Sequence, residues 1–395
     1  MSQSIPKTTK TWRVKGQNGF DSLSYDTQAT LPELGANDVL VKLHAASLNY
    51  RDLIIPKGLY PFALVDEVIP GSDGAGEVIA VGSKVTRFAP GAKVLTLFNQ
   101  GHIGGSLDQL TAKTGLGGVI DGTLRQHGIF NENGLVDMPT SLSYLEAATL
   151  PCAALTAWNA LYGLKPLKPG DVVLTQGTGG VSIFAVQFAK AAGATVIATT
   201  SSDAKASALK KLGVDHVINY KTTPEWGAHA RSLTPSSVGV THIIEVGGPT
   251  TIAQSLKAIK LDGIISIIGF VGGEAQEKEP GFLDCLVNIC TVRGLLVGSR
   301  EIPWLTRRCL LWMRLRRLIN ICGTRNILAS WPSKSIKTRM SACPVKMSCQ
   351  DVMSECQVAC EDFISPIICT SIPIPYRQEQ TLTDTYIKYI HTIQK

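Results

Sequence analysis

Glycine is almost absent from the last 95 residues of this 395-residue chain, which contain only Gly323 of its 37 glycines. Turns and helix C-caps often need the positive φ that glycine adopts at little cost, so an evolved domain rarely avoids glycine so completely. The same region contains seven of the ten cysteines. A boundary near Arg300 therefore separates two kinds of sequence.

Cysteine is scarce in residues 1–300, where only Cys152, Cys285 and Cys290 occur. This usage predicts a reducing compartment and no structural disulfides. The first residues lack the apolar core of a signal peptide, and no run of about 18 apolar residues would span a membrane. The C-terminus contains no targeting signal. We therefore expect a cytoplasmic protein without a membrane partner.

An excess of charge of one sign is missing from the same region. Of the formal net charge of +7, residues 1–300 contribute almost nothing, with 25 Lys or Arg against 24 Asp or Glu, whereas residues 301–395 contain 13 and 7. A nearly neutral body offers no basic surface for nucleic acid, so no nucleic-acid partner is expected. The 44% hydrophobic and 17% charged content indicate a folded chain rather than a disordered one.

Residues 10–150 are rich in glycine, proline and short β-type runs such as "GAGEVIAVG" and "GAKVLTL". This pattern predicts a strand-rich, barrel-like domain. A long helix is expected over residues 143–164, because Ser143 and Glu146 form a Ser–x–x–Glu start before a long apolar face.

Strands and helices alternate over residues 168–272. Short buried runs such as "GDVVLTQG" and "THIIEVGG" are followed by helical patterns, the last of them over residues 250–263. This alternation predicts a parallel, doubly wound sheet, and the fold class is therefore α/β.

A glycine-rich loop lies directly between a predicted strand and a predicted helix. Glycine there permits a tight turn and close backbone approach to a pyrophosphate, and the helix N-terminus offers unpaired N–H groups. Ser182 takes the third-glycine position and is small enough for close packing. The alternative is a purely structural turn; the strand–helix context favours dinucleotide binding. The predicted loop residues are Gly177, Thr178, Gly179, Gly180 and Val181.

The end of the next predicted strand indicates which dinucleotide binds. NAD sites usually have Asp or Glu there for the ribose hydroxyls, whereas this chain has hydroxyl residues that include Ser201 and Ser202, followed by Lys205. Hydroxyls with a lysine suit a 2′-phosphate, so NADPH is favoured over NADH as the cofactor. The alternative is an ordinary helix N-cap with a solvated lysine, and Asp203 nearby weakens the case for NADPH.

Several stretches together resemble the zinc-independent branch of the medium-chain dehydrogenase/reductases, which are NADPH-linked quinone oxidoreductases and alcohol dehydrogenase-like proteins. The resemblance covers roughly residues 10–300. It implies a GroES-like catalytic domain and a Rossmann domain, with the nicotinamide in the cleft between them. We therefore expect a GroES-like domain over 1–155, a Rossmann domain over 156–300, and no evolved domain over 301–395. The stretches are "SLNYRDL", "KGLYP", "PGSDGAGEVIAVG", "TLPCAALTAWNAL" and "QGTGGVSIFAVQFAKAAGA".

The resemblance also locates candidate catalytic and cofactor residues. It implies that Asn49 and Asp52 line the cleft beside the nicotinamide, and that Tyr50 and Tyr60 donate phenolic hydrogen bonds. The alternative is that Asp52 pairs with Arg51 or caps a turn while the tyrosines pack. It places Thr156 near the nicotinamide, Tyr220 near the phosphates, and Gly247, Gly248 and Gly269 where backbone approaches the cofactor. Relatives commonly dimerise through the sheet edge, which here includes residues 291–299.

The resemblance implies that the chain binds no catalytic zinc. Zinc-dependent relatives have Cys and a His–Glu pair where this chain has Asn49 and Ser72–Asp73, and only Cys152 stands at a ligand position. A catalytic zinc needs about three protein ligands. We therefore expect a zinc-independent oxidoreductase that transfers hydride to a quinone, enone or related carbonyl, or oxidises the corresponding alcohol. The alternatives are a non-catalytic NADPH-binding protein and an inactive product of a faulty gene model.

The last region is consistent with a shifted reading frame. Relatives continue after "VGSR" with a helix, then Pro-Val-Val-Asp, an Ala-Tyr helix and a His-Phe-Gly-Lys strand, none of which is visible here. Reading each codon one base earlier permits Pro-Val-Val-Asp at residues 303–306 and His-Phe-Gly-Lys before Trp331. We therefore expect 301–331 to be the family C-terminus decoded out of frame. The rival is an evolved, metal-binding tail, which the irregular cysteine spacing disfavours.

Overall fold

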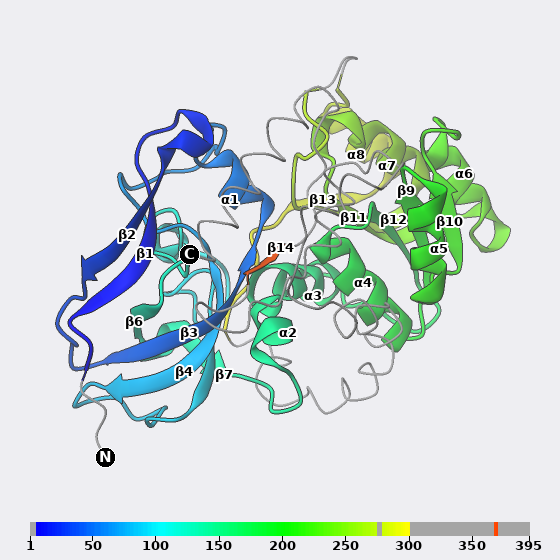
Figure 1. Ribbon diagram of the computed structural model, residues 1–395. Coiled ribbons are helices and arrows are strands. Elements are labelled where there is room, and N and C mark those ends of the chain that lie inside the picture. Colours follow the sequence, from blue (N-terminus) through cyan, green and yellow to red (C-terminus); the bar gives the residue numbers. More distant parts are fainter. Residues whose placement is uncertain (1–4, 275–278, 301–366, 370–395) are drawn as a thin grey trace, which may run out of the picture. The chain divides into compact units, whose positions relative to one another are not determined.

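The computed structural model describes residues 5–274, 279–300 and the backbone of 367–369 (Figure 1). The described residues fall into two compact units, one formed mainly by residues up to Cys152 and the other by Ala153–Gly298. Apart from 367–369, the region predicted to be an aberrant tail lies outside the described residues. None of the helices among the described residues is long and apolar enough to cross a membrane.

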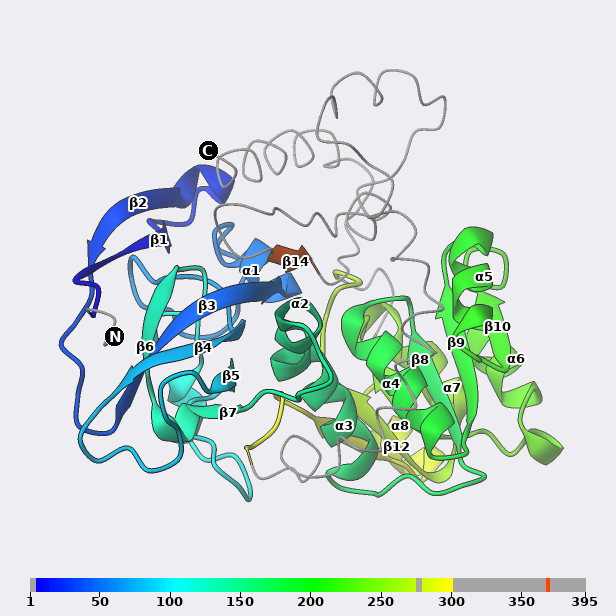
Figure 2. The same cartoon turned by 60° about the horizontal axis from the view of Figure 1, so that its bottom comes forward.

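The first unit is built from antiparallel strands (Figure 2). β1 and β2 pair with each other, while β3 pairs with both β4 and β6, and β4 continues through β5 to β7. β14 adds a short parallel pairing to β3. The elements are β1 (Thr8–Val14), β2 (Leu23–Thr30), β3 (Asp38–Leu48), α1 (Tyr50–Ile54), β4 (Asp73–Val81), β5 (Lys93–Thr96), β6 (His127–Asn131), β7 (Leu135–Asp137), α2 (Tyr144–Ala148) and β14 (Ile367–Cys369).

Alternating apolar side chains of these strands form the core of the first unit. Val39, Val41 and Leu43 on β3 point to one face, as expected from the two-residue period of a strand. They pack with Val78 of β4 and Val94 of β5, and all five side chains are buried. This arrangement confirms the strand-rich domain expected from the sequence.

The second unit contains a six-stranded parallel sheet in the order β10-β9-β8-β11-β12-β13. This is the doubly wound order of dinucleotide-binding sheets, with its switch point between β8 and β11. The elements are α3 (Leu155–Tyr162), β8 (Val172–Gln176), α4 (Gly180–Ala191), β9 (Thr195–Thr200), α5 (Asp203–Lys211), β10 (His216–Asn219), α6 (Trp226–Ser232), β11 (Val240–Glu245), α7 (Ile252–Ala258), β12 (Ile259–Ile267), α8 (Phe282–Asn288) and β13 (Thr291–Gly294).

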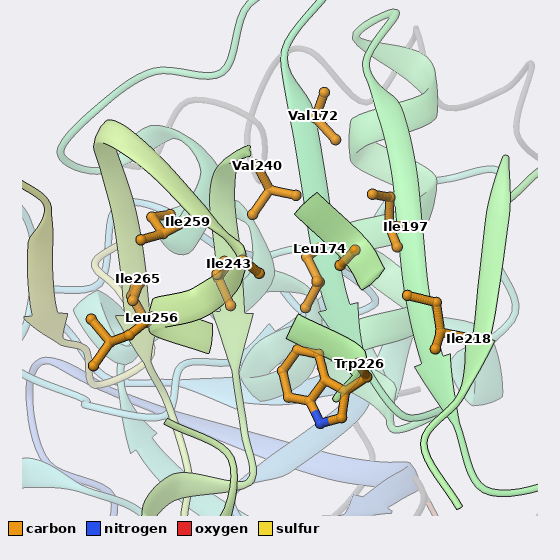
Figure 3. Packing of buried hydrophobic residues seen from close by; sticks show 12 residues of the cluster. Val172, Leu174, Ile197, Ile218, Trp226, Val240, Ile243, Leu256, Ile259 and Ile265 are labelled. Carbon is orange, nitrogen blue, oxygen red and sulfur yellow. The ribbon is translucent and has the colours of Figure 1, made fainter. Parts of the chain in front are cut away.

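A continuous apolar layer covers one face of this sheet (Figure 3). Leu174, Ile197 and Ile243 come from three neighbouring strands and are fully buried. Trp226 of α6 and Leu256 of α7 pack against them. Burial of each such side chain contributes on the order of 2 kcal/mol, so this layer fixes the strands whose ends form the candidate site.

Two helix predictions need correction. The helix predicted over 143–164 begins with the expected capping pair, Glu146 N–H donating to Ser143 Oγ at 3.3 Å. It is divided, however, into α2, a π-helical turn over Leu150–Ala154, and α3, because Pro151 has no N–H for the α-helical ladder. The helix predicted over 250–263 ends at Ala258, since Ile259 is extended and begins β12.

Candidate functional site

The glycine loop follows β8, at the carboxyl end of the central strand. Gly177 has a φ of +70°, and a Cβ placed there would meet nothing within 4 Å. Gly179 precedes α4 in an extended conformation, and no side chain caps that helix. Uncapped N–H groups at a helix N-terminus, next to open space, are suited to a phosphate. The loop residues therefore fit a dinucleotide, with Thr178, Gly180 and Val181 in the same strand–helix turn.

Ser182, which stands where a third glycine is common, holds the loop to the strand. It is buried, and its hydroxyl donates to the carbonyl oxygen of Gln176 at 2.6 Å. A glycine there would pack as closely but could not make this bond. The first turn of α4 is thus fastened to the last residue of β8.

The hydroxyl residues predicted to select the cofactor follow β9. Ser202 is the N-cap of α5, accepting a hydrogen bond from the Lys205 N–H at 3.4 Å, so the N-cap alternative describes its role within the chain. Ser201 lies between the strand and this cap. Tyr220 follows β10, and its N–H donates to the Thr200 carbonyl at 3.0 Å, which brings it beside the end of β9. The four residues therefore lie at two neighbouring strand ends.

A fully buried carboxylate, Glu245, ends β11 beside the glycine loop. Its Oε2 accepts hydrogen bonds from Gln176 Nε2 at 2.6 Å and from the Ser255 hydroxyl at 2.5 Å. Its Oε1 accepts from the Gly247 and Gly248 N–H groups, both at 3.0 Å. The sequence analysis missed this residue, although an acid inside the apolar run "THIIEVGG" is itself a signal, because a carboxylate is buried only when donors surround it.

The glycines after β11 and β12 have a reason within the chain for being glycine. A Cβ on Gly247 would lie 2.3 Å from Thr251 Oγ1, and one on Gly269 would lie 3.0 Å from the Val246 carbonyl oxygen. Gly248 has a φ of +76° and would meet Phe270. These positions lie at the carboxyl edge, where a cofactor was predicted, and contacts within the chain also leave little room for a Cβ there.

In the first unit, Asn49 and Asp52 form the start of α1, directly after β3 (Figure 2). The Asn49 N–H donates to Asp52 Oδ2 at 2.8 Å, a contact that caps the helix. Burial raises the pKa of Asp52, and the neighbouring Arg51 guanidinium acts in the opposite direction. Within the chain, Asp52 therefore caps a helix, which is the role that the alternative to catalysis predicted.

Asn49 also belongs to a buried polar cluster with Ser72, Asp73 and Cys152. Its Nδ2 donates to Ser72 Oγ at 3.3 Å, and that hydroxyl donates to Asp73 Oδ1 at 2.7 Å. The Cys152 N–H donates to Asp73 Oδ2 at 3.0 Å. Burial raises the pKa of Asp73 to about 7, with a smaller contribution from Asp52, although its hydrogen bonds favour the charged form. A carboxyl that changes charge near neutral pH therefore lies two hydrogen bonds from Asn49.

The two candidate tyrosines differ in their surroundings. The Tyr60 hydroxyl accepts a hydrogen bond from Arg51 Nε at 3.2 Å, and the guanidinium also stacks over Phe98. Tyr50 is the first residue of α1 and is half-buried, which raises its pKa. Tyr60 is thus joined to α1 through Arg51, whereas Tyr50 is part of α1 itself.

The residues at the family's zinc positions do not fit a catalytic zinc. Zinc sites use thiolate, imidazole and carboxylate ligands, and about three of these are needed. Here the positions hold an amide, a hydroxyl, one thiol and a carboxylate whose two oxygens already accept hydrogen bonds from Ser72 and Cys152. Nowhere in 5–274 or 279–300 do three His, Cys, Asp or Glu side chains gather as an ion site.

The structure thus brings most predicted residues into two groups. The first group follows the carboxyl ends of strands β8 to β12 in the second unit, and consists of the glycine loop, Ser201, Ser202, Lys205, Tyr220, Gly247 and Gly269. Asn49, Tyr50, Asp52 and Tyr60 lie on or beside α1 in the first unit. Thr156 belongs to neither group, since it is buried within α3.

Two family models match the chain. A model described as the alcohol dehydrogenase GroES-like domain matches residues 35–140, and one described as zinc-binding dehydrogenase matches residues 180–310. A zinc-type alcohol dehydrogenase-like protein of Schizosaccharomyces pombe is 47% identical over 288 residues, which are 71% of this chain and 82% of that protein. The chloroplastic quinone-oxidoreductase QR1 of Triphysaria versicolor is 35% identical over 56% of this chain and 63% of its own.

Solved structures agree with the fold. The crystal structure of a putative alcohol dehydrogenase from Sinorhizobium meliloti matches with a TM-score of 0.67 and 36% identity, covering 83% of this chain and 91% of that one. The parallel sheet in doubly wound order, the strand-rich first unit and the matched family models all lead to one assignment. The chain belongs to the medium-chain dehydrogenase/reductase family of NAD(P)-binding oxidoreductases.

Proposed function

We propose that this oxidoreductase uses NADPH to reduce a quinone, an enone or a related carbonyl, or oxidises the corresponding alcohol, without a catalytic zinc. One observation carries the proposal: the uncapped N-terminus of α4 and the open space at Gly177 adjoin a β9 end that has hydroxyls and Lys205 where NAD sites have an acid. The resemblance to a quinone oxidoreductase supports the substrate class.

When bound, NADPH supplies the hydride from its nicotinamide ring. The chain's own contribution is to hold the negative charge that develops on the substrate oxygen. Asn49 and Tyr50 carry an amide and a phenol that donate hydrogen bonds, and Asp73 exchanges a proton near neutral pH two hydrogen bonds away. Asp52 and Tyr60 were expected to act in catalysis; we propose instead that they position α1 and Arg51 around these groups through the hydrogen bonds to Asn49 and Arg51. Thr156 is retained as a nicotinamide contact.

NADPH consumption by the purified chain, measured with a panel of quinones, enals and alcohols and compared with NADH, tests this proposal. We expect turnover with quinones or enals, and at least tenfold higher kcat/KM with NADPH. Tyr50→Phe removes only the phenolic oxygen and should lower kcat about tenfold without changing NADPH affinity. Tyr25→Phe, on β2, is the matched control. A preference for NADH would contradict the cofactor assignment.

A non-catalytic NADPH-binding protein is the second candidate, and one observation favours it. Asp52 Oδ2 and the Tyr60 hydroxyl, which belong to two of the four predicted catalytic residues, already accept hydrogen bonds within the chain. Tight NADPH binding without turnover on any member of the panel would establish this candidate instead. Turnover that falls in Tyr50→Phe would exclude it.

We also propose a cytoplasmic homodimer with domains at 1–155 and 156–300. Among the described residues β13 is the last strand of its sheet, and the neighbouring helix α8 exposes apolar side chains, with Phe282 97% and Leu283 73% exposed. Exposed strand edges and apolar patches of this kind are typical of interfaces. Light scattering of the wild-type chain and of Phe282→Glu tests the dimer: we expect the variant to be monomeric, and an unchanged mass would place the interface elsewhere.

For residues 301–331 we propose translation of the family C-terminus in the wrong frame, after a lost stretch of message, and for residues 332–395 continued reading in that frame. The support is the order and spacing of family segments recovered by a one-base shift. Sequencing the 3′ end of the native transcript tests this. We expect a transcript with a restored frame that encodes Pro-Val-Val-Asp through His-Phe-Gly-Lys. A transcript that encodes 301–395 as written would contradict this expectation, and the frame shift could then only be a past mutation in the gene.

A further inference from the structure

Helix α8 ends in a Schellman motif, a capping arrangement closed by two backbone hydrogen bonds. The Cys290 N–H donates to the Cys285 carbonyl, and the Ile289 N–H donates to the Leu286 carbonyl, both at 3.1 Å. Ile289, with φ 44° and ψ 55°, is the left-handed residue that such a motif requires. Cys285 and Cys290 are therefore the two positions whose side chains this motif brings into contact.

The capping motif holds the two cysteines next to each other. A disulfide needs Cα atoms roughly 4.4 to 6.8 Å apart with converging Cβ atoms. The backbone of this pair is joined by one hydrogen bond, and Cys285 lies close enough to Cys290 to raise the pKa of the Cys290 thiol. Both residues are free and partly exposed, so a small oxidant reaches them. The proposed hydride transfer makes no use of either residue.

We propose that Cys285 and Cys290 form a reversible intrachain disulfide. This disulfide covalently links the end of α8 to the residue that directly precedes β13. Thr291, the first residue of β13, directly follows the pair. The Ile289 carbonyl also accepts a hydrogen bond from the Asp262 N–H at 2.6 Å, which ties the same turn to β12. In the reduced chain these hydrogen bonds alone hold the strained turn, and the disulfide adds a covalent bond across it.

Glutathione disulfide is the oxidant class that balances the reaction. The Cys285 thiolate attacks one sulfur of glutathione disulfide, which breaks that S–S bond and releases one glutathione thiolate. Cys290 then loses its proton to water and attacks the Cys285 sulfur, releasing the second glutathione thiolate. Two protein thiols are oxidised and one glutathione disulfide is reduced to two glutathione molecules. Burial and the neighbouring Cys285 raise the pKa of the Cys290 thiol, which disfavours its thiolate.

Peptide mapping of the full chain, after incubation with glutathione disulfide and blocking of free thiols, tests the site directly. Both cysteines fall in the tryptic peptide 279–293, which contains no other cysteine. We expect this peptide to become two hydrogens lighter and to lose both alkylation tags, and reductant to reverse the change. Recovery of the peptide with both thiols alkylated, or with a glutathione on each, would overturn the proposal.

Two variants and a control distinguish this pair from other thiols. In C290S, glutathione should remain on Cys285 because no second thiol displaces it, whereas C152S should form the disulfide like the wild type. A bond from Cys285 to Cys152, to another chain or to a cysteine beyond Arg300 would contradict the intrachain assignment. Hydrogen exchange at the Cys290 amide should slow about tenfold on oxidation. Unchanged exchange would show that the bond does not close the helix end.

Discussion

The Gln176 side-chain amide donates a hydrogen bond to the Glu245 carboxylate at 2.6 Å, across the switch point of the parallel sheet. Gln176 ends β8 and Glu245 ends β11, the two neighbouring strands from which the sheet is wound in opposite directions. Gln176 Oε1 in turn accepts from the Val246 and Gly247 N–H groups. This pair therefore sets the loop after β11 in register with the glycine loop after β8.

Glu245→Ala should destabilise the chain by about 3 kcal/mol or more, because it leaves several buried donors without an acceptor. NADPH affinity should fall as well, because the Glu245 hydrogen bonds that connect the two loops at the switch point are lost. Denaturant unfolding and a binding titration measure the two effects. Glu225→Ala is the matched control, because Glu225 is an exposed glutamate on the same unit that pairs with Lys257. Equal effects of the two substitutions would show that the buried contacts of Glu245 contribute nothing.

Asp73 should make stability fall as the pH rises from about 4 to 7. Its pKa is raised from 3.8 to about 7 in the folded chain, so over this range the folded state binds a proton that the unfolded state has lost. The contribution is complete below pH 4, is lost above pH 7 and amounts to at most about 4 kcal/mol. Asp73→Asn removes this titration.

Urea unfolding of wild type and Asp73→Asn at several pH values tests this expectation. The variant should show a flatter dependence between pH 4 and 7, with the residual slope coming partly from Asp52, whose pKa is also raised by burial. Asp66→Asn, an exposed change on the same unit, should leave the wild-type slope intact. The same slope in all three proteins would mean that Asp73 ionises at its ordinary pKa.

The fold was more predictable from the sequence than the contacts of the site. Alternating strand and helix patterns fixed the doubly wound sheet, because burial on both faces leaves a readable apolar run such as "GDVVLTQG". The glycine loop was located because its glycines stand directly between a strand pattern and a helix pattern. Contacts between distant residues, such as Ser72 and Asp73 with Cys152, depend on how strands pair and were not readable as a cluster.

Local sequence patterns do not decide between two possible uses of one residue. Ser202 was predicted to bind phosphate and is an N-cap within the chain, and both roles use the same hydroxyl at the same strand end. Gly247 and Gly269 were predicted from cofactor approach, and Thr251 and Val246 also lie close to where a Cβ would stand at these positions. Glycine patterns report that a close approach exists but not which group approaches.

Lys205→Ala should lower kcat/KM for NADPH at least tenfold while changing that for NADH less than twofold. The physical reason is that an ammonium group stabilises a 2′-phosphate, which NADH lacks. Steady-state kinetics with both cofactors give the two ratios. Lys210→Ala, an exposed change in the last turn of the same helix, should alter neither. Parallel losses with NADPH and NADH would assign Lys205 to α5 stability rather than to cofactor choice.

Ile289→Gly should stabilise the second unit by about 1 kcal/mol. A β-branched residue at φ 44° is strained by contact of its Cβ with the backbone, whereas glycine adopts this conformation freely. The Ile289 side chain is 60% exposed, so its removal loses little buried area. Both hydrogen bonds of the Schellman motif come from backbone groups that glycine retains.

Thermal unfolding monitored by calorimetry measures the gain, which corresponds to a rise of a few degrees in Tm for a unit of this size. Ile289→Val is the matched control, because valine is also β-branched, retains the strain and should leave Tm unchanged. The experiment is done under reducing conditions, so that no bond between Cys285 and Cys290 contributes. If glycine lowers Tm while valine does not, then contacts of the Ile289 side chain stabilise the turn by more than the backbone strain destabilises it.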